Sequence, residues 1–458
     1  MTTIRRPPLA RPGERAFTEA TEVFNLAAPA RPAAAITART IDDVRAALRH
    51  ARAEGLPVRV HTTGHGAGGV RPVDGGLLIH TRVDGGVEVD AARRRARIPA
   101  GTRWGAVVEA TAPHGLTAAH GSSATVGVVG YLLGGGMSFY GRRHGLAANT
   151  VVALDLVTAE GEHLRVDAAT DPDLFWAIRG GGGGFGVVTA VEIALFPVAA
   201  VITGAAYWPA AHAERLLSRW REWSATAPWE VTTSVRVMNL PPVPDVPPEL
   251  ATGPMLCVDG AVLSDTADLA TATRQADELL GPLREIAAPV LDTWRPGPAA
   301  AVLDAHMDPA QPMPVVGDHL LLGDLDADGA ETLLRVLGDG SPLIAAGLRQ
   351  LGGAYAVSAP DGGVLDRLDA AFSYAGSGVP MGPVTAEELR GHCALVREAL
   401  RPWDTGRTVP CFVEDFTRPQ GHLSAEQVRA VDAVRARVDP DGLFHGDIAP
   451  HATARTLN

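Results

Sequence analysis

The segment RVHTTGHGAGG, residues 59–69, places a histidine, His65, among glycines directly after a short apolar run. Gly64, Gly66 and Gly69 satisfy the dinucleotide fingerprint GxGxxG literally. A unit of that kind needs a helix to begin at the glycines, so that the helix amides meet a pyrophosphate. The residues that follow, VRPVDGGLLIH, instead contain a proline, a turn and a strand pattern. We therefore interpret the segment as a loop whose exposed amides cradle a diphosphate without a helix.

His65 by itself is a weak signal, because a histidine between glycines is more often a turn or surface residue than a catalytic one. Two further glycine-rich segments, YLLGGGMSFYGRRHGL and RGGGGGFGVVTA, strengthen it. Apolar strand or helix patterns flank both segments, whereas polar residues flank a flexible linker. Three such loops in one half of the chain indicate a large, flat, phosphate-bearing ligand that lies against the main chain.

The composition excludes several classes of protein. A net charge of −12 argues against nucleic acid as a partner, because binding phosphates requires a basic face. The sequence contains no lysine, so all 40 basic residues are arginine. A lysine Schiff base, a pyridoxal phosphate anchor and a phosphate-loop lysine are therefore excluded. This arginine-only usage, rich in alanine and glycine, is typical of a high-GC bacterial genome.

Length and cysteine content narrow the possibilities further. A chain of 458 residues is too long for one hydrophobic core and is expected to form two or three substructures. Its three cysteines, Cys257, Cys393 and Cys411, match neither a disulfide framework nor a zinc site, so we expect no metal. No apolar run reaches the roughly 18 residues that cross a bilayer, and the N-terminus lacks the apolar stretch of a secretory signal. We expect no membrane partner and a cytoplasmic location.

The elements that position these loops follow from hydrophobic spacing and turn residues. Helices are expected at 41–53, 104–112, 211–226 and 423–438, and strands at 57–60, 76–81, 87–90, 95–101, 151–166 with a turn at 160–161, and 185–196. A proline-rich loop is expected at 241–254, and alternating strands and helices follow it. This pattern predicts an α+β protein with a glycine-rich first half and a helical tail.

The motifs together resemble a known family. VRVHTTGHGAGG, VGVVGYLLGGGMSFYGRRHGLAANTVVALDLVTAEG, DPDLFWAIRGGGGGFGVVT and, near the end, VDPDGLF resemble FAD-linked oxidases of the berberine-bridge-enzyme-like branch of the vanillyl-alcohol oxidase/PCMH superfamily. The resemblance implies a two-subdomain PCMH-type FAD-binding domain at 28–198, after an N-terminal extension at 1–27. It also implies an antiparallel-sheet substrate domain backed by helices at 199–405, and a C-terminal segment at 406–458 that returns to the FAD domain.

The resemblance also implies the residues that hold FAD. The loop histidine of the family bonds covalently to the C8-methyl group of the flavin, and that position is His65. Relatives with a second link carry a cysteine where this chain has Ser123, so we expect attachment through one residue. Cys411 or Glu414, in VPCFVEDF, stands where relatives carry an asparagine that faces the flavin. The other expected cofactor-binding residues are His61, Thr62, Thr63, Gly64, Gly66, Gly121, Ser122, Val126, Gly127, Gly135, Gly136, Ser138, Asn149 and Val188.

The implied activity is that of an oxidase. Such an enzyme takes a hydride from an alcohol, a sugar or a secondary-metabolite intermediate and passes the electrons to O2, giving H2O2. A flavin dehydrogenase with another acceptor, and a catalytically silent flavin-binding homologue, remain alternatives. The expected partners are a small-molecule substrate and O2, in a monomer or a homodimer.

A general base is expected in the substrate domain, whose sheet covers the flavin in this family. Tyr355, in the expected strand QLGGAYAVS at 350–358, is our first candidate, and His319 is the second. A tyrosine has a solution pKa of about 10, so Tyr355 needs a nearby cation to act near neutrality. The alternative for Tyr355 is a plain core aromatic of the strand.

Overall fold

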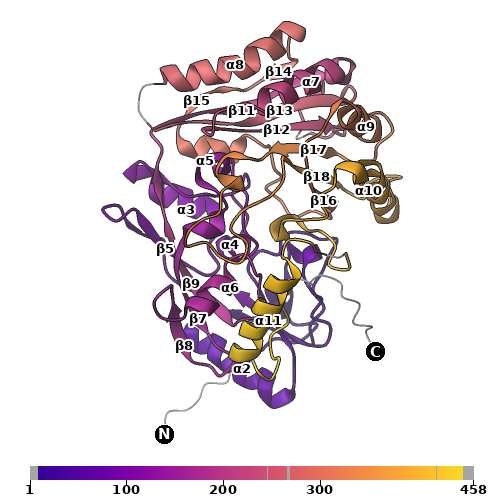
Figure 1. Ribbon diagram of the computed structural model, residues 1–458. Coiled ribbons are helices and arrows are strands. Elements are labelled where there is room, and N and C mark those ends of the chain that lie inside the picture. The colour runs from indigo at the N-terminus through magenta and orange to yellow at the C-terminus, as the bar shows by residue number, and fades with distance from the viewer. Residues whose placement is uncertain (1–8, 245, 266–268, 419, 447–458) are drawn as a thin grey trace.

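The computed structural model describes residues 9–244, 246–265, 269–418 and 420–446. Figure 1 shows a large sheet with helices on its outer side and, below it, a mixed body formed by the N-terminal part of the chain. The C-terminal helix α11 (Ala425–Val438) lies on this lower body rather than on the large sheet. The chain therefore leaves the lower body, builds the upper layer and returns.

The first part of the lower body is a small parallel sheet in the order β1-β3-β2. Its strands are β1 (Ala34–Ala38), β2 (Val58–His61) and β3 (Leu77–Thr81). Parallel neighbours need a crossover connection, and α2 (Ile41–Glu54) supplies it between β1 and β2. A capping box at the start of α2 and the left-handed Gly55 at its end fix its length. As a result β2 runs directly into the glycine-rich loop.

The second part of the lower body is an antiparallel sheet in the order β4-β5-β9-β7-β8. Its strands are β4 (Glu88–Asp90), β5 (Arg95–Pro99), β7 (Val151–Val157), β8 (His163–Val166) and β9 (Val187–Ala194). The apolar side chains of three helices pack against it in one core. These helices are α3 (Trp104–Thr111), α4 (Val128–Leu133) and α6 (Pro172–Ile178). Short elements complete this body: α1 (Arg15–Thr21), the β6 (Leu116–Thr117) and β10 (Phe196–Pro197) pair, and α5 (Gly141–His144).

The upper layer is an antiparallel sheet of eight strands in the order β14-β11-β13-β12-β17-β18-β16, with β15 also paired to β11. These strands are β11 (Ala200–Pro209), β12 (Val231–Met238), β13 (Met255–Ser264), β14 (Leu291–Asp292), β15 (Arg295–Gly297), β16 (Val316–Leu322), β17 (Ala345–Gln350) and β18 (Phe372–Gly378). The helices on its outer side (Figure 1) are α7 (Ala213–Ser224), α8 (Ala270–Ile286), α9 (Ala327–Leu337) and α10 (Ala386–Leu400).

The inner face of the large sheet is polar. Alternate side chains of a strand point to opposite faces, and on β12 Val235 and Val237 pack into the core beneath the helices. Arg236 lies between them and therefore points to the lower body. On β13 Val258 joins the same core, so Asp259 shares the inner face with Arg236.

The expected fold class is confirmed, and the helices and strands expected in the first half are present within a few residues of their expected limits. The strand expected at 350–358 is wrong. β17 ends at Gln350, and Gly352 and Gly353 have φ angles of +76° and +56°, which turn the chain out of the sheet into a 3-10 turn at Gly353–Ala356. Within the described residues, no helix has both the length and the apolar character needed to span a bilayer.

Asp439 ties the end of the chain to the strand that carries the glycine-rich loop. Its two carboxylate oxygens accept from the amides of Leu443 and Phe444 at 2.9 and 2.7 Å, and the Leu443 carbonyl accepts from Val58 of β2 at 2.8 Å. Asp439→Ala would leave two buried amides without acceptors, so we expect the free energy of unfolding in urea to fall by about 2 kcal/mol.

Asp441→Ala is the matched control for this measurement. The Asp441 side chain is 74% exposed and pairs with Arg52 at 3.2 Å. An exposed pair contributes little, so we expect a change of about 0.5 kcal/mol or less. Equal losses of unfolding free energy in Asp439→Ala and Asp441→Ala would contradict the role given to Asp439.

Candidate functional site

The loop that follows β2 is held from behind by the N-terminal segment. Gly64 has a φ of +69°, and a Cβ there would lie 2.6 Å from the Cβ of Val23, so only glycine fits. The amides of Phe24 and Asn25 donate to the carbonyls of Thr63 and Gly64 at 2.8 and 3.2 Å. The N-terminal segment, for which we predicted no role, thus shapes the loop.

The loop also presents main-chain donors that have no acceptor. Within the described residues, the amides of Thr63, Gly64, His65 and Gly66 donate no hydrogen bond. A Cβ added to Gly66 would meet no atom within 4 Å. Consecutive backbone amides left without acceptors form a concavity that binds anions. The loop therefore fits the diphosphate of FAD.

His65 is clamped at the centre of this loop. Its ring stacks on Phe24, with centroids 3.6 Å apart and planes inclined by 14°. Its Nε2 lies 3.0 Å from the Thr125 hydroxyl, which in turn lies 2.9 Å from the Ser123 hydroxyl. Burial lowers the pKa of His65 to about 4, despite the opposing influence of Asp308, so the imidazole is neutral at pH 7.

His61 has a different environment from the one expected for it. Its Nε2 lies 2.9 Å from the Ala20 carbonyl, and its ring lies edge-on to His80 with centroids 4.9 Å apart. Burial, and then His80, lowers its pKa to about 3. The side chain of His61 therefore points to the N-terminal segment, and only its main chain is directed to the loop.

The segment 121–127, which precedes α4, meets the loop of His65 at Gly127. The Gly127 amide donates to the Thr63 hydroxyl at 3.3 Å, and a Cβ on Gly127 would lie 3.2 Å from Thr62. Within the same segment Ser122 donates to Asp308 at 2.6 Å, while the Val126 carbonyl accepts from an α3 amide at 3.0 Å. The segment 121–127 thus bridges the loop of His65 and the connection that leads to the large sheet.

The turn after α4 joins the same group of loops. The Gly134 carbonyl accepts from the Cys411 amide at 3.3 Å. Gly135 packs on Leu365, and so does Gly180 of the five-glycine run at 180–184. In the same run, the Gly182 amide donates to the carbonyl of Leu133, the last residue of α4, at 3.1 Å. The glycine-rich segments are therefore neighbours in space, as the sequence predicts.

Four further residues of the expected set, two of them glycines, make their contacts within the protein. Gly136 packs against Tyr131, and so does Gly121. The Asn149 amide donates to the Asp366 carbonyl at 2.8 Å. Val188 is buried in β9, in the core of the lower body.

The C-terminal segment enters beside these loops with both of its candidate residues. Cys411 lies against Gly134, as described above, and Glu414 lies against the loop of His65. The Glu414 carboxylate accepts from the Asn25 side chain at 3.1 Å, and the Phe416 amide donates to the Gly68 carbonyl at 2.9 Å. Burial raises the pKa of Glu414 to about 8, although the Asn25 hydrogen bond opposes this shift. Both residues therefore border the loops expected to hold the cofactor, called the cofactor loops below: the loop of His65 and the Gly134–Gly136 turn.

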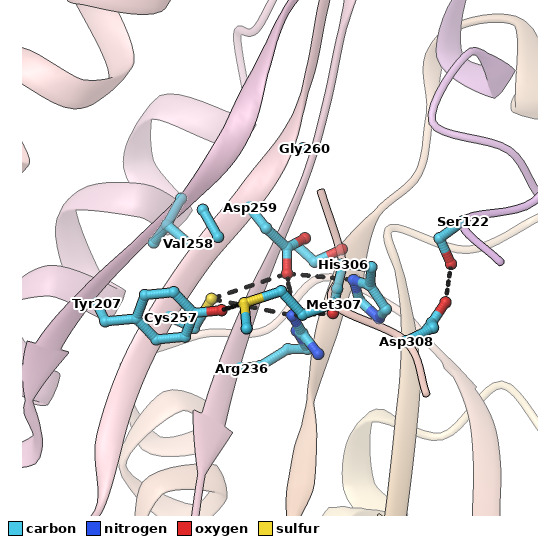
Figure 2. Close-up of polar contacts among 12 residues, drawn as sticks. Ser122, Tyr207, Arg236, Cys257, Val258, Asp259, Gly260, His306, Met307 and Asp308 are labelled. Atoms are coloured by element: carbon cyan, nitrogen blue, oxygen red, sulfur yellow. Dashed lines mark hydrogen bonds and ion pairs between the residues drawn. The ribbon is translucent and has the colours of Figure 1, made fainter. Parts of the chain in front are cut away.

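The inner face of the large sheet carries a buried ion pair. Arg236 donates to Asp259 through Nε at 2.8 Å, and the same carboxylate oxygen lies 3.1 Å from Nδ1 of His306. Figure 2 shows these side chains converging from adjacent strands and a loop, with the Ser122–Asp308 hydrogen bond beside them. Burial alone would raise the pKa of Asp259, but Arg236 and then His306 lower it below its usual range. No local sequence pattern indicates this network, because its members are far apart along the chain.

The two candidate bases have different surroundings. Tyr355 is fully buried, and its hydroxyl donates to the Ser138 carbonyl at 2.7 Å and accepts from the Ser138 amide at 2.8 Å. Burial raises the pKa of Tyr355 well above its usual range, which opposes action as a base. His319 lies on β16, its Nδ1 is 2.7 Å from the Tyr374 carbonyl, and its Nε2 has no hydrogen bond among the described residues. Burial lowers the pKa of His319 to about 4.

Comparison with known proteins identifies the domain that carries these loops. A family model described as an FAD binding domain matches residues 32–167. (R)-6-hydroxynicotine oxidase of Paenarthrobacter nicotinovorans is 37% identical over 166 residues, which cover 36% of this chain and 36% of that protein. The FAD-dependent monooxygenase FUP4 of Fusarium proliferatum is 38% identical over 180 residues, 39% of this chain and 35% of that protein. The matched part thus spans about a third of these relatives.

Solved structures match over the whole chain. 6-Hydroxy-D-nicotine oxidase from Arthrobacter nicotinovorans superposes with a TM-score of 0.82 at 22% identity and covers 98% of both chains. Berberine-bridge-enzyme-like 1 of Physcomitrella patens superposes with a TM-score of 0.78 at 18% identity, over 96% of this chain and 95% of that one. Identities this low show the fold alone. They confirm the fold that the resemblance implies, and the domain match confirms FAD binding as the function of the family model at residues 32–167.

Gly64 and Gly66 allow a matched test of the loop. Gly64→Ala forces a Cβ into Val23 at a left-handed φ, so we expect the free energy of unfolding to fall by about 1–3 kcal/mol. Gly66 has a φ of −88° and open space beside it, so Gly66→Ala should change this free energy by only about 0.5 kcal/mol. If a diphosphate lies over Gly66, the added methyl group lowers the FAD content per chain, which absorbance measures.

The two variants give distinct results. Gly66→Ala should lose FAD while its flavin-free form keeps its stability in urea. Full FAD content in Gly66→Ala would show that the diphosphate does not lie on this side of the loop.

Proposed function

Residues 32–167 form an FAD-binding domain, and the chain has the fold of the berberine-bridge-enzyme-like branch of the vanillyl-alcohol oxidase/PCMH superfamily, so we propose that the protein is an FAD-dependent oxidoreductase. The observation that carries the proposal is the row of four amides, residues 63–66, that donate no hydrogen bond within the part of the chain that the structure describes. They supply donors for a diphosphate at the place where a flavin ring would meet an imidazole. When bound, FAD supplies the electron-accepting ring.

The proposal includes one covalent link, from His65 to the C8-methyl group of the flavin. A neutral imidazole keeps a lone pair on one ring nitrogen. Nε2 of His65 faces the Thr125 hydroxyl, whereas Nδ1 has no hydrogen bond among the described residues, so Nδ1 is the nitrogen left for the bond. A solved glucooligosaccharide oxidase is described as carrying 6-S-cysteinyl, 8α-N1-histidyl FAD. This chain has Ser123, engaged with Thr125, in place of a cysteine for the second link.

We propose a small organic molecule as the substrate and O2 as the final acceptor. The substrate loses a hydride and a proton, and O2 gains both electrons and two protons to become H2O2. Support comes from the names of similar proteins, which include oxidases of 6-hydroxynicotine and of xylooligosaccharides. Release of one H2O2 for each substrate oxidised tests this part of the proposal, and turnover without peroxide would favour the dehydrogenase alternative.

For the base that removes the substrate proton we propose His319. The Tyr374 carbonyl accepts from Nδ1–H, which fixes the tautomer and leaves the lone pair on Nε2. The low pKa keeps this imidazole neutral at pH 7, as a base must be before it accepts a proton. Its ring centroid lies 5.5 Å from that of Phe412, in the segment that borders the cofactor loops. Tyr355 instead uses its hydroxyl to hold the main chain of Ser138.

The covalent link is tested on the purified protein. We expect a mass increase of one FAD that survives acid denaturation, and we expect His65→Ala to leave the flavin extractable, because the bonding nitrogen is lost. Thr125→Val keeps the imidazole but removes the partner of Nε2, so the linked fraction should fall without disappearing. Flavin that stays bonded in His65→Ala would disprove a single link through this residue.

The choice of base is tested with a compound that reduces the flavin in an anaerobic screen of alcohols and sugars. Loss of a general base typically lowers the rate of the chemical step by 10²–10⁴. We expect His319→Gln to slow flavin reduction by about that factor, while Tyr355→Phe retains most of the rate. Stopped-flow absorbance measures both rates, and the opposite ranking would return Tyr355 to first place.

A further inference from the structure

Arg349 is a buried cation on the inner face of the large sheet. It lies on β17, opposite Ser234 of β12 and Ser373 of β18, and is 8% exposed. Its Cζ lies 4.2 Å from the ring centroid of Phe139, which belongs to the turn that follows the Gly134–Gly136 loop. Its side chain therefore reaches across to the lower body, at the junction where the cofactor loops meet the sheet.

The contacts of Arg349 leave the end of its guanidinium unused. Nε donates to the Ser234 hydroxyl at 3.3 Å, and the Phe139 ring covers one face of the planar group. Neither Nη1 nor Nη2 makes a hydrogen bond or an ion pair with any residue that the structure describes. The two nitrogens that form the fork of an arginine are thus available to a ligand.

Other buried arginines of this chain differ in this respect. Arg142 directs its terminal nitrogens to the carbonyls of Leu351 and Ala227, and Arg179 directs one to the carbonyl of Gly362. These main-chain acceptors replace the water that burial removes. Arg349 has no such acceptors in the described part of the chain, so its charge calls for a partner from outside the protein.

The charges on the inner face also favour an anionic ligand for Arg349. Asp259 is fully buried and is already shared by Arg236 and His306. The nearby Asp308 acts electrostatically on Arg236 and accepts from Ser122, so neither carboxylate forms an ion pair with the Arg349 guanidinium within the described residues. A single carboxylate would pair with this guanidinium, whereas a phosphate monoester carries nearly two negative charges at neutral pH. The planar fork of a guanidinium also matches a carboxylate in geometry.

We propose that Arg349 binds a carboxylate of the substrate, so that the substrates of this enzyme are organic acids. The inference rests on the proposed flavin-dependent function, because it places this carboxylate at the junction of the cofactor loops and the sheet. The diphosphate of FAD has its own donors in the amides of Thr63 to Gly66, and the oxidised flavin ring is neutral. The substrate is therefore the source of the anion.

The test uses the full chain with its flavin and a panel of simple probes: acetate, butyrate and benzoate, each beside its neutral amide. Binding is followed by the change in flavin absorbance and by the shift in melting temperature. We expect the wild type to bind at least one carboxylate more tightly than its amide. Arg349→Gln should raise the Kd of that carboxylate at least tenfold and leave the Kd of the amide unchanged.

Two further variants keep the result interpretable. Arg349→Lys retains the charge without the fork, so it should fold even if the glutamine variant does not, and it should bind with intermediate affinity. Arg390→Gln, at an exposed position on α10, is the control and should bind like the wild type. No preference for carboxylate over amide in the wild type, or an unchanged Kd in both Arg349 variants, would overturn the proposal.

The flavin offers a second outcome that would also overturn it. If Arg349→Gln lowers the midpoint potential of the flavin while the Kd of the carboxylate is unchanged, the charge of Arg349 acts on the reduced flavin and not on a substrate. A wild-type protein that binds no FAD would instead contradict the proposed function. In that case the melting-temperature shifts with carboxylate and amide still test Arg349 by themselves.

Discussion

The close approach of Gly68 and Gly69 to the returning C-terminal segment is the contact on which the rest of the architecture depends. A Cβ on either glycine would lie 2.4 Å or less from the carbonyl oxygen of Glu414 or Val413. The main chains can therefore touch only because both positions lack a side chain. The Cγ of Glu414 also borders Gly317 of β16, so the segment around Val413 and Glu414 connects the loop of His65 to the large sheet. Lower body and upper layer are positioned through this segment.

Burial sets the charge of the groups around the loops. It lowers the pKa values of His65, His61, His120 and His319 far enough that all four imidazoles are neutral at pH 7. Arginine keeps its charge under the same conditions because its guanidinium is not deprotonated in proteins. In a chain without lysine, the positive charge near the site comes from arginines, among them Arg103 near His65 and Arg236 and Arg349 on the large sheet. Asp259 pairs with Arg236, whereas Arg349 forms no ion pair within the described residues.

Tyr355 shows how one residue type serves two roles that sequence alone does not separate. A tyrosine after LGGA is a reasonable base if the strand continues past it. The chain instead leaves the sheet at Gly352 and Gly353, and this turn buries the Tyr355 ring against Gly141 with its hydroxyl on Ser138. The hydroxyl fixes the turn that presents Phe139 to Arg349. Its contribution to the site is structural and indirect.

The sequence by itself determined the α+β class, the elements of the first half and the three glycine-rich segments, because these depend on local spacing, and its resemblance to a family implied FAD and the role of His65. Glycines where the chain turns or approaches another segment, apolar residues at helix or strand periods, and a histidine after a strand are all visible over a dozen residues. Only the tertiary structure decided which side chains surround that histidine. Phe24 and Asn25 come from the N-terminal segment, Thr125 from the next loop and Glu414 from the far end of the chain. The sheet register placed Arg236 beside Asp259 and left Arg349 without an ion pair to any carboxylate of the described residues. Pairing across a sheet depends on contacts between distant segments, which no local pattern encodes.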